Sequence, residues 1–178
     1  MTGSRSDPLS REIMRAIFAG DIERFDALVA KGFDVHGVTL PDHWNLLHRG
    51  LVSLNTPPSA AMIDHLIELG VGVNVADRYG NTPLHYAAEL KDPALLESLL
   101  RAGALVDPLN HDGLTPLRLM LRSKPFKLDA VETLLAHGAN VEQRAEGGTS
   151  LLDYARTIAH GDDRALVDLL ERYRKPRP

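Results

Sequence analysis

Apolar residues recur on one side of short segments along the chain, and polar residues fill the positions between them. Leu95, Leu96, Leu99 and Leu100 stand at positions i, i+1, i+4 and i+5, a one-sided stripe typical of an amphipathic helix. Gly103 then suits the left-handed residue that ends such a helix. The pattern predicts five helix pairs, at about 9–31, 45–69, 83–102, 116–137 and 150–173.

Two short sequence motifs recur in register and indicate that the helix pairs are copies of one unit. The first reads Asn-Thr-Pro-Leu-His-Tyr-Ala-Ala at residues 81–88, and its frame returns at 110–117, with degenerate copies at 147–155 and 42–48. The second is an apolar pair followed by a glycine, and its glycines fall at positions 32, 70, 103 and 138. The intervals of 38, 33 and 35 residues are typical of a stacked repeat with short insertions.

The first motif predicts a tight turn followed by the start of a helix. Thr82 suits a helix N-cap, and Pro83 fits the first helical position because its missing N–H is not needed there. Gly80 and Gly113 suit turns that require a positive φ, as a hairpin-like finger would. One helix pair cannot bury its apolar stripe alone, so neighbouring units must stack.

This two-motif pattern resembles the ankyrin-repeat family over roughly residues 9–173. The resemblance implies an all-α fold, an ankyrin-repeat solenoid of about five helix-turn-helix units with short hairpin-like finger loops. We expect residues 1–8 to be a flexible N-terminus and residues 174–178 a basic C-terminal tail. The single domain over 9–173 divides into units at about 9–38, 39–76, 77–109, 110–144 and 145–173.

The second and fourth units depart from the pattern. In the second, His43 stands where the turn glycine would be, and residues 55–58 lengthen the loop between the two helices. In the fourth, residues 123–127 lengthen the same loop, and Arg118 replaces the histidine that the family has at this position. Insertions in loops cost little free energy, so both long loops are either neutral insertions or additional contacts to a partner.

Composition and charge narrow the classes of function. The chain has no cysteine, which excludes disulfides and fits a reducing compartment. No apolar run reaches the ~18–20 residues that cross a bilayer, so we expect a cytoplasmic protein with no membrane partner. The net charge is −4, and residues 1–171 alone hold 16 basic and 24 acidic groups. An acidic body leads us to expect a basic protein partner and no nucleic acid.

The eight histidines do not form a metal motif. No two of them stand in a His-Glu-x-x-His or His-x-His frame. His48 and His85 occupy the position of the family's structural histidine, which implies hydrogen bonds to the backbone of neighbouring loops. There is also no Gly-x-Ser-x-Gly elbow, no phosphate loop and no dinucleotide-binding motif. We therefore expect no metal, no cofactor, no catalytic residue and no enzyme activity.

The resemblance implies that the finger tips and the inner sides of the first helices form a concave face that binds protein. Carried over by position, the expected partner-binding residues are Asp42, Trp44, Arg78, Tyr79, Asn81, Glu89, Leu90, His111, Asp112, Leu114, Arg122 and Glu146. Val52 and Ser123 extend the same row. Trp44 either belongs to this interface or fills space left by the irregular second unit.

The leading hypothesis is a stand-alone cytosolic monomer that binds one folded partner on this face and inhibits or sequesters it. An immunity protein or an inhibitor of a toxin or enzyme would work in this way. The alternative is a structural adaptor or scaffold subunit in a multiprotein assembly. End-on stacking would require apolar end caps, and the first cap is polar in sequence, with Arg11, Arg15, Glu23 and Arg24.

Overall fold

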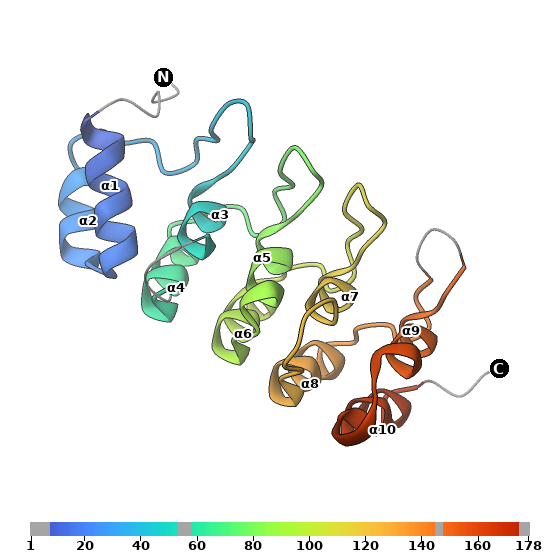
Figure 1. Cartoon of the computed structure of the whole chain (residues 1–178). Helices are drawn as coiled ribbons and strands as arrows, with labels where there is room; N and C mark the ends of the chain where they lie inside the picture. Colours follow the sequence, from blue (N-terminus) through green and yellow to red (C-terminus); the bar gives the residue numbers. More distant parts are fainter. Residues whose placement is uncertain (1–7, 53–57, 145–147, 175–178) are drawn as a thin grey trace.

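The computed structural model describes residues 8–52, 58–144 and 148–174, and this part of the chain folds into five helix pairs stacked in a row (Figure 1). The inner helices, which come first in each pair, are α1 (Pro8–Ala19), α3 (Leu46–Leu51), α5 (Pro83–Leu90), α7 (Pro116–Met120) and α9 (Leu151–Ile158). The outer helices are α2 (Ile22–Val29), α4 (Ala60–Glu68), α6 (Pro93–Arg101), α8 (Leu128–Ala136) and α10 (Arg164–Arg172). A short 3-10 turn, η1 (Gly161–Asp163), precedes α10. The expected all-α solenoid is confirmed.

Side-chain caps start the inner helices at the predicted positions. Thr115 caps α7, since its Oγ1 accepts a hydrogen bond from the N–H of Arg118 at 3.2 Å, and Pro116 takes the first helical position. Asn45 replaces that threonine in the second unit, and its Oδ1 accepts from the N–H of His48 at 3.1 Å. Both caps satisfy a backbone donor that the first helical turn leaves unpaired. The local sequence therefore fixes where these helices begin.

A hairpin-like loop, called a finger below, precedes each of α3, α5 and α7, over residues 39–45, 77–82 and 110–115. The turns of the second and third fingers hold Gly80 at φ 79° and Gly113 at φ 69°, as expected. His43 adopts the same left-handed conformation, with φ 58°, where the family pattern has glycine. The irregular finger therefore has the same backbone turn as the others, although a left-handed conformation is strained for a residue with a side chain such as His43.

Backbone hydrogen bonds join each finger to the next. The N–H of Arg78 donates to the carbonyl of Asp42 at 3.0 Å, and the N–H of His111 donates to the carbonyl of Tyr79 at 2.9 Å. Figure 1 shows the fingers projecting on the same side of the stack. Because each finger is held by its neighbour, the side chains near the tips have a fixed spacing along the row.

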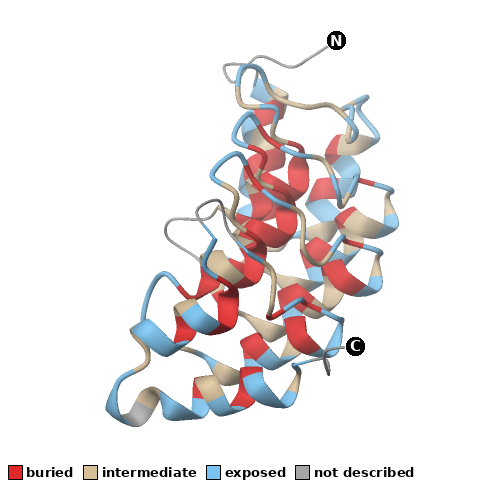
Figure 2. Ribbon diagram, turned by 90° about the vertical axis from the view of Figure 1, so that its right-hand side faces the viewer, coloured by how far each residue is buried: buried red, intermediate tan, exposed pale blue. Residues whose placement is uncertain are grey.

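The core is one continuous cluster of apolar side chains between the helix rows (Figure 2). In the central unit Leu84, Ala87 and Ala88 of α5 are fully buried, together with Leu96 and Leu99 of α6. The helix α5 packs against α3 on one side and α7 on the other, and the small alanines allow these close approaches. Burying each large apolar side chain contributes roughly 2 kcal/mol, so the stacked arrangement supplies most of the driving force for folding.

The long loop of the fourth unit is fastened to the third unit by a buried lysine. Lys91 ends α5 in a left-handed conformation with φ 54°. Its Nζ donates to the carbonyl of Ser123 and, at 2.9 Å, to the carbonyl of Pro125. Burial lowers the pKa of the Lys91 amine, and the neighbouring Lys127 acts in the same direction. This tether gives residues 123–127 a defined place beside α5.

Several expectations fall outside the described residues. These are the flexible N-terminus over residues 1–7, most of the long loop at 55–58, the binding residue Glu146 and most of the basic tail. Within the residues that the structure describes, no helix combines the length and the apolar character needed to cross a membrane.

Candidate partner-binding surface

The fingers and the exposed sides of the inner helices form one continuous surface, called the inner face below. Its framework depends on a buried carboxylate in the second finger, Asp77, which is only 5 % exposed. One carboxylate oxygen accepts from the backbone N–H groups of Tyr79 and Asn81, at 2.8 and 2.9 Å. The other accepts from the indole N–H of Trp44 at 3.2 Å and the hydroxyl of Tyr86 at 2.6 Å. Asp77 therefore ties two fingers and α5 together.

These contacts set the ionisation of the site. Burial raises the pKa of Asp77, but its four hydrogen bonds together outweigh burial and leave the pKa below the ordinary value. Burial raises the pKa of the Tyr86 hydroxyl, and its bond to Asp77 raises it further. Asp77 is thus charged and Tyr86 neutral at neutral pH. Sequence reasoning did not identify Asp77 as a central residue.

The two histidines expected to be structural do bond to the next finger. The Nε2 atom of His48 lies 3.1 Å from the carbonyl oxygen of Asn81, and that of His85 lies 3.1 Å from the carbonyl oxygen of Leu114. Burial lowers the pKa of both imidazoles, although these hydrogen bonds act in the opposite direction. Each ring is fully buried, so neither is available to a ligand.

Arg118, which replaces this histidine in the fourth unit, likewise bonds to a backbone carbonyl of the next loop. Its Nη1 donates to the carbonyl of Thr149 at 3.1 Å, in the loop before α9. The guanidinium also lies over the ring of Tyr154, 4.7 Å from its centroid. A longer, charged side chain therefore makes the contact to the next loop and leaves a positive charge on the inner face.

The structure brings three predicted residues together at the tips of the first two fingers. The guanidinium of Arg78 lies 3.9 Å from the carboxylate of Asp42 and 5.1 Å from the ring centroid of Tyr79. Tyr79 is 56 % exposed. Tyr and Arg are among the residue types that most often contribute to interface energy.

The structure shows one of the two roles that the sequence position of Trp44 left open, namely local packing. Its indole is fixed by the bond to Asp77 and by an edge-on contact to Tyr86, with ring centroids 5.8 Å apart. The side chain is only half-buried, and it also lines a hollow next to α1 and α3. The residue thus packs locally while it presents part of its surface to the inner face.

Two adjoining hollows in the middle of the inner face contain five of the predicted residues. A hollow of about 400 Å³ is lined by Glu89, Arg122, Leu119 and Ser123. The next, of about 380 Å³, is lined by Asp112, Leu114, Arg118, Arg122 and Tyr154. Arg122 lies between them. Burial raises the pKa of Glu89, and the charge of Arg122 opposes this.

Some predicted residues are less accessible than the family pattern implied. The side chain of Asn81 accepts a hydrogen bond from the amide of Asn110 at 2.9 Å and so joins the second finger to the third. Leu90 packs against the core, and Leu114 is half-buried. His111 is exposed as expected. Asn81 is less accessible because the second and third fingers bond to each other, and a single motif does not reveal such a contact between units.

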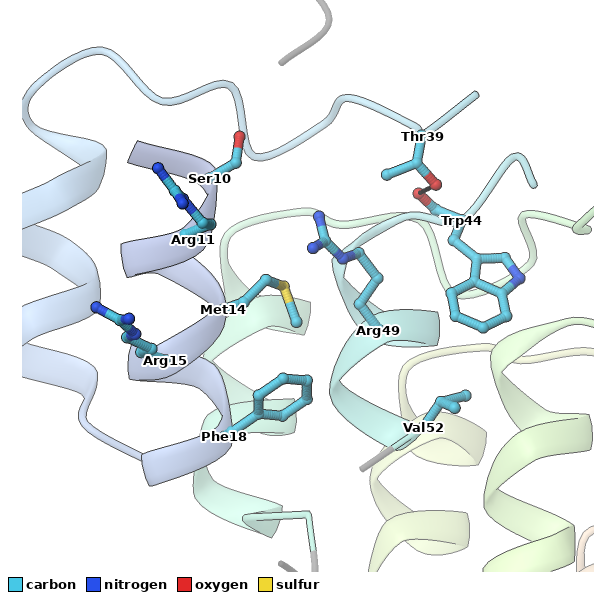
Figure 3. A pocket seen from close by; sticks show the side chains of 9 residues that line it. All are labelled: Ser10, Arg11, Met14, Arg15, Phe18, Thr39, Trp44, Arg49 and Val52. Carbon is cyan, nitrogen blue, oxygen red and sulfur yellow. Dashed lines mark hydrogen bonds between the residues drawn. The ribbon is translucent and has the colours of Figure 1, made fainter. Parts of the chain in front are cut away.

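A further hollow, of about 350 Å³, lies between α1 and α3 at the N-terminal end of the inner face (Figure 3). Met14 and Phe18 extend from α1 towards α3, and Trp44 and Val52 complete the apolar part. The polar lining residues are Ser10, Arg11, Arg15, Thr39 and Arg49. Sequence reasoning treated α1 as a polar end cap and missed this hollow, although Met14 and Phe18 stand at helical i, i+4 spacing.

Charge is distributed unevenly between the two helix rows. The inner helices carry five arginines and three acidic side chains, whereas the outer helices carry four arginines and nine acidic side chains. Among the helices, the acidic side chains are therefore concentrated in the outer row. Among the described residues, no group of three or more His, Asp or Glu side chains is arranged to hold a metal ion.

Comparison with known proteins matches residues 13–107 to ankyrin repeats in three copies. The ankyrin repeat domain-containing protein SAT10 of Stachybotrys chartarum is 34 % identical over 108 residues, or 59 % of this chain. The nuclear factor NF-kappa-B p105 subunit of Gallus gallus is 31 % identical over 52 % of the chain, and the NF-kappa-B inhibitor zeta of Mus musculus 31 % over 51 %. The matches cover 5, 10 and 17 % of those relatives' own lengths. The chain therefore belongs to the ankyrin-repeat family, whose repeats are general modules for binding other proteins.

Proposed function

We propose that the inner face binds one folded partner protein in the cytosol and covers part of its surface, so that the partner is inhibited or sequestered. The observation that carries this proposal is the group formed by the exposed Arg78 and Tyr79 and the half-buried Asp42, on fingers that are hydrogen-bonded into one frame. A frame fixed before binding loses less conformational entropy when a partner docks. Binding, rather than catalysis, is the activity that we assign to this surface.

A relative supports the inhibitory form of the proposal. The name of the NF-kappa-B inhibitor zeta describes an inhibitor, and this chain matches it over 124 residues. The hollows along the inner face are shallow and arranged in a row, which suits an extended contact with a protein surface. A partner seated there would have the contacted part of its own surface hidden from its substrates.

Truncating the finger tips is expected to weaken binding without unfolding the chain. Arg78→Ala, Tyr79→Ala and Asp112→Ala remove exposed side chains, so the melting temperature of the triple variant should match the parent's. Losing an anchoring Tyr and Arg should cost about 2 kcal/mol or more of binding free energy, roughly a thirtyfold loss of affinity. Titration calorimetry against the purified partner measures this loss.

The partner can be obtained by affinity capture from cells that express the chain, with the triple variant run in parallel. A matched control carries Glu68→Ala and Asp168→Ala, two exposed substitutions on the outer helices α4 and α10. The partner should remain bound to the control and be lost by the triple variant. If the parent, the control and the triple variant all retained the same amount of partner, the binding surface would lie elsewhere.

A further inference from the structure

The hollow between α1 and α3 has a mixed chemistry that indicates what it can bind. Met14, Phe18 and Val52 give it an apolar part, in which Met14 is buried at 7 % exposure, Val52 is half-buried and Phe18 is 39 % exposed. A flexible Met beneath an exposed Phe can adapt to an incoming apolar group. Phe18 is therefore the exposed apolar contact that this hollow offers to another protein.

Three arginines border the same hollow, and among the residues that the structure describes no acidic side chain lines it. Arg11 and Arg15 stand on α1 and Arg49 on α3 (Figure 3). Arg15 is paired with Glu12 at 3.1 Å, but its side chain is 70 % exposed, so its guanidinium can also reach a second carboxylate. Guanidinium groups form paired hydrogen bonds with carboxylates, which makes arginine well suited to acidic ligands.

The positive charge continues along the inner face beyond this hollow. Arg118 and Arg122 line the middle hollows, where the acidic residues are Glu89 and Asp112. The three hollows together thus hold five arginines and two acidic residues, in a chain whose net charge is −4. The expectation of a basic partner came from the overall charge. The charges that line these three hollows favour an acidic one.

We propose that the α1/α3 hollow is the docking site for a short acidic segment of the partner protein. A large apolar side chain of that segment lies on Met14 and Phe18, and its flanking Asp or Glu carboxylates pair with Arg11, Arg15 and Arg49. This inference deepens the proposed function and rests on it. The apolar part distinguishes a protein segment from a nucleic acid, whose phosphates would use the arginines but leave Met14 and Phe18 unoccupied.

The test uses a display library of random 12-residue peptides, selected on the full chain at low salt. Peptides recovered on the parent protein should be enriched in Asp and Glu around an aromatic or large aliphatic residue. The most enriched peptide, labelled with a fluorophore, should bind the Arg11→Gln, Arg15→Gln double variant about tenfold more weakly. Raising the salt to 0.5 M should also weaken binding, because exposed charges are then screened.

The matched control carries Arg101→Gln and Arg172→Gln, which remove the same charge from the outer helices α6 and α10. Binding of the peptide to this control should equal binding to the parent. Phe18→Ser tests the apolar contact separately and should also weaken binding about tenfold. Each variant should melt at the parent's temperature, which separates loss of the site from loss of the fold.

Four results would overturn the inference. The first two concern the selection: basic peptides are enriched, or no peptide is enriched. The third is that the control Arg101→Gln, Arg172→Gln weakens peptide binding as much as Arg11→Gln, Arg15→Gln does. The fourth is that a labelled oligouridine binds more tightly than any peptide and depends on the same arginines. The finger-tip triple variant distinguishes this failure from failure of the proposed function. If that variant still loses the captured partner while Arg11→Gln, Arg15→Gln retains it, the inner face binds the partner and only the docking site is wrong.

Discussion

Replacing Gly80 by alanine is expected to destabilise the chain by about 3 kcal/mol. The φ of 79° at this turn costs a residue with a side chain about 1 kcal/mol. A Cβ atom would also lie 2.9 Å from the backbone nitrogen of His111 and 3.1 Å from the Cα of Asn110. These are backbone atoms of the next finger, so relief of the clash requires the two fingers to separate.

Gly103→Ala provides the matched control for this substitution. Gly103 has a similar φ of 86°, but a Cβ there meets no atom within 4 Å. Only the backbone strain remains, and the expected loss is about 1 kcal/mol. Urea unfolding of both variants measures the difference in the free energy of unfolding. Equal losses would show that the contact between the second and third fingers adds nothing to the stability.

Replacing Asp77 by alanine is expected to cost about 3 kcal/mol, because four hydrogen-bond donors lose their acceptor at once. Asp77→Asn should cost less. The third finger shows why, since Asn110 uses its Oδ1 to accept from the N–H groups of Asp112 and Leu114, at 3.0 and 2.9 Å. An asparagine at position 77 keeps those two backbone bonds and loses the acceptor for Trp44 and Tyr86.

Comparing the parent with Asp77→Asn also predicts how the contribution of Asp77 to the free energy of unfolding depends on pH. The pKa of Asp77 is lowered on folding from its ordinary value of 3.8, so the folded state favours the charged carboxylate. The stability from this group is fully present above that value and is lost as the pH falls through the lower pKa of the folded state. The gap in unfolding free energy between the parent and Asp77→Asn should therefore narrow between pH 6 and pH 3. A constant gap would mean that folding does not lower the pKa of Asp77.

The repeat pattern predicted the fold because each unit carries its own local signals. Pro83 and Pro116 open α5 and α7, and Gly103 ends the α6 turn in the left-handed conformation that was expected. Such signals depend on backbone preferences within a few residues, so they can be read from one sequence. The five helix pairs follow from them, and the structure places the helices within these predicted segments.

The inner face was harder to predict because it depends on contacts between units. Asp77 bonds to Trp44, 33 residues away in sequence, and Asn81 bonds to Asn110 in the next finger. The sequence predicted a polar first cap from Arg11, Arg15, Glu23 and Arg24, and it did not single out Met14 and Phe18, which line the hollow between α1 and α3. The overall charge also does not reveal how the charges divide between the two helix rows, where acidic side chains gather on the outer helices.

Hydroxyl-radical footprinting of the chain, with and without the captured partner, tests most directly whether the inner face is the binding surface. Radicals oxidise exposed aromatic, sulfur-containing and large aliphatic side chains, and Phe18 and Tyr79 report on the α1/α3 hollow and on the finger tips. The exposed Leu105 and Leu109, which line none of the three hollows, serve as references. We predict that the partner protects Phe18 and Tyr79 and leaves the two leucines unchanged. Protection of Leu105 and Leu109 with continued oxidation of Phe18 and Tyr79 would contradict it.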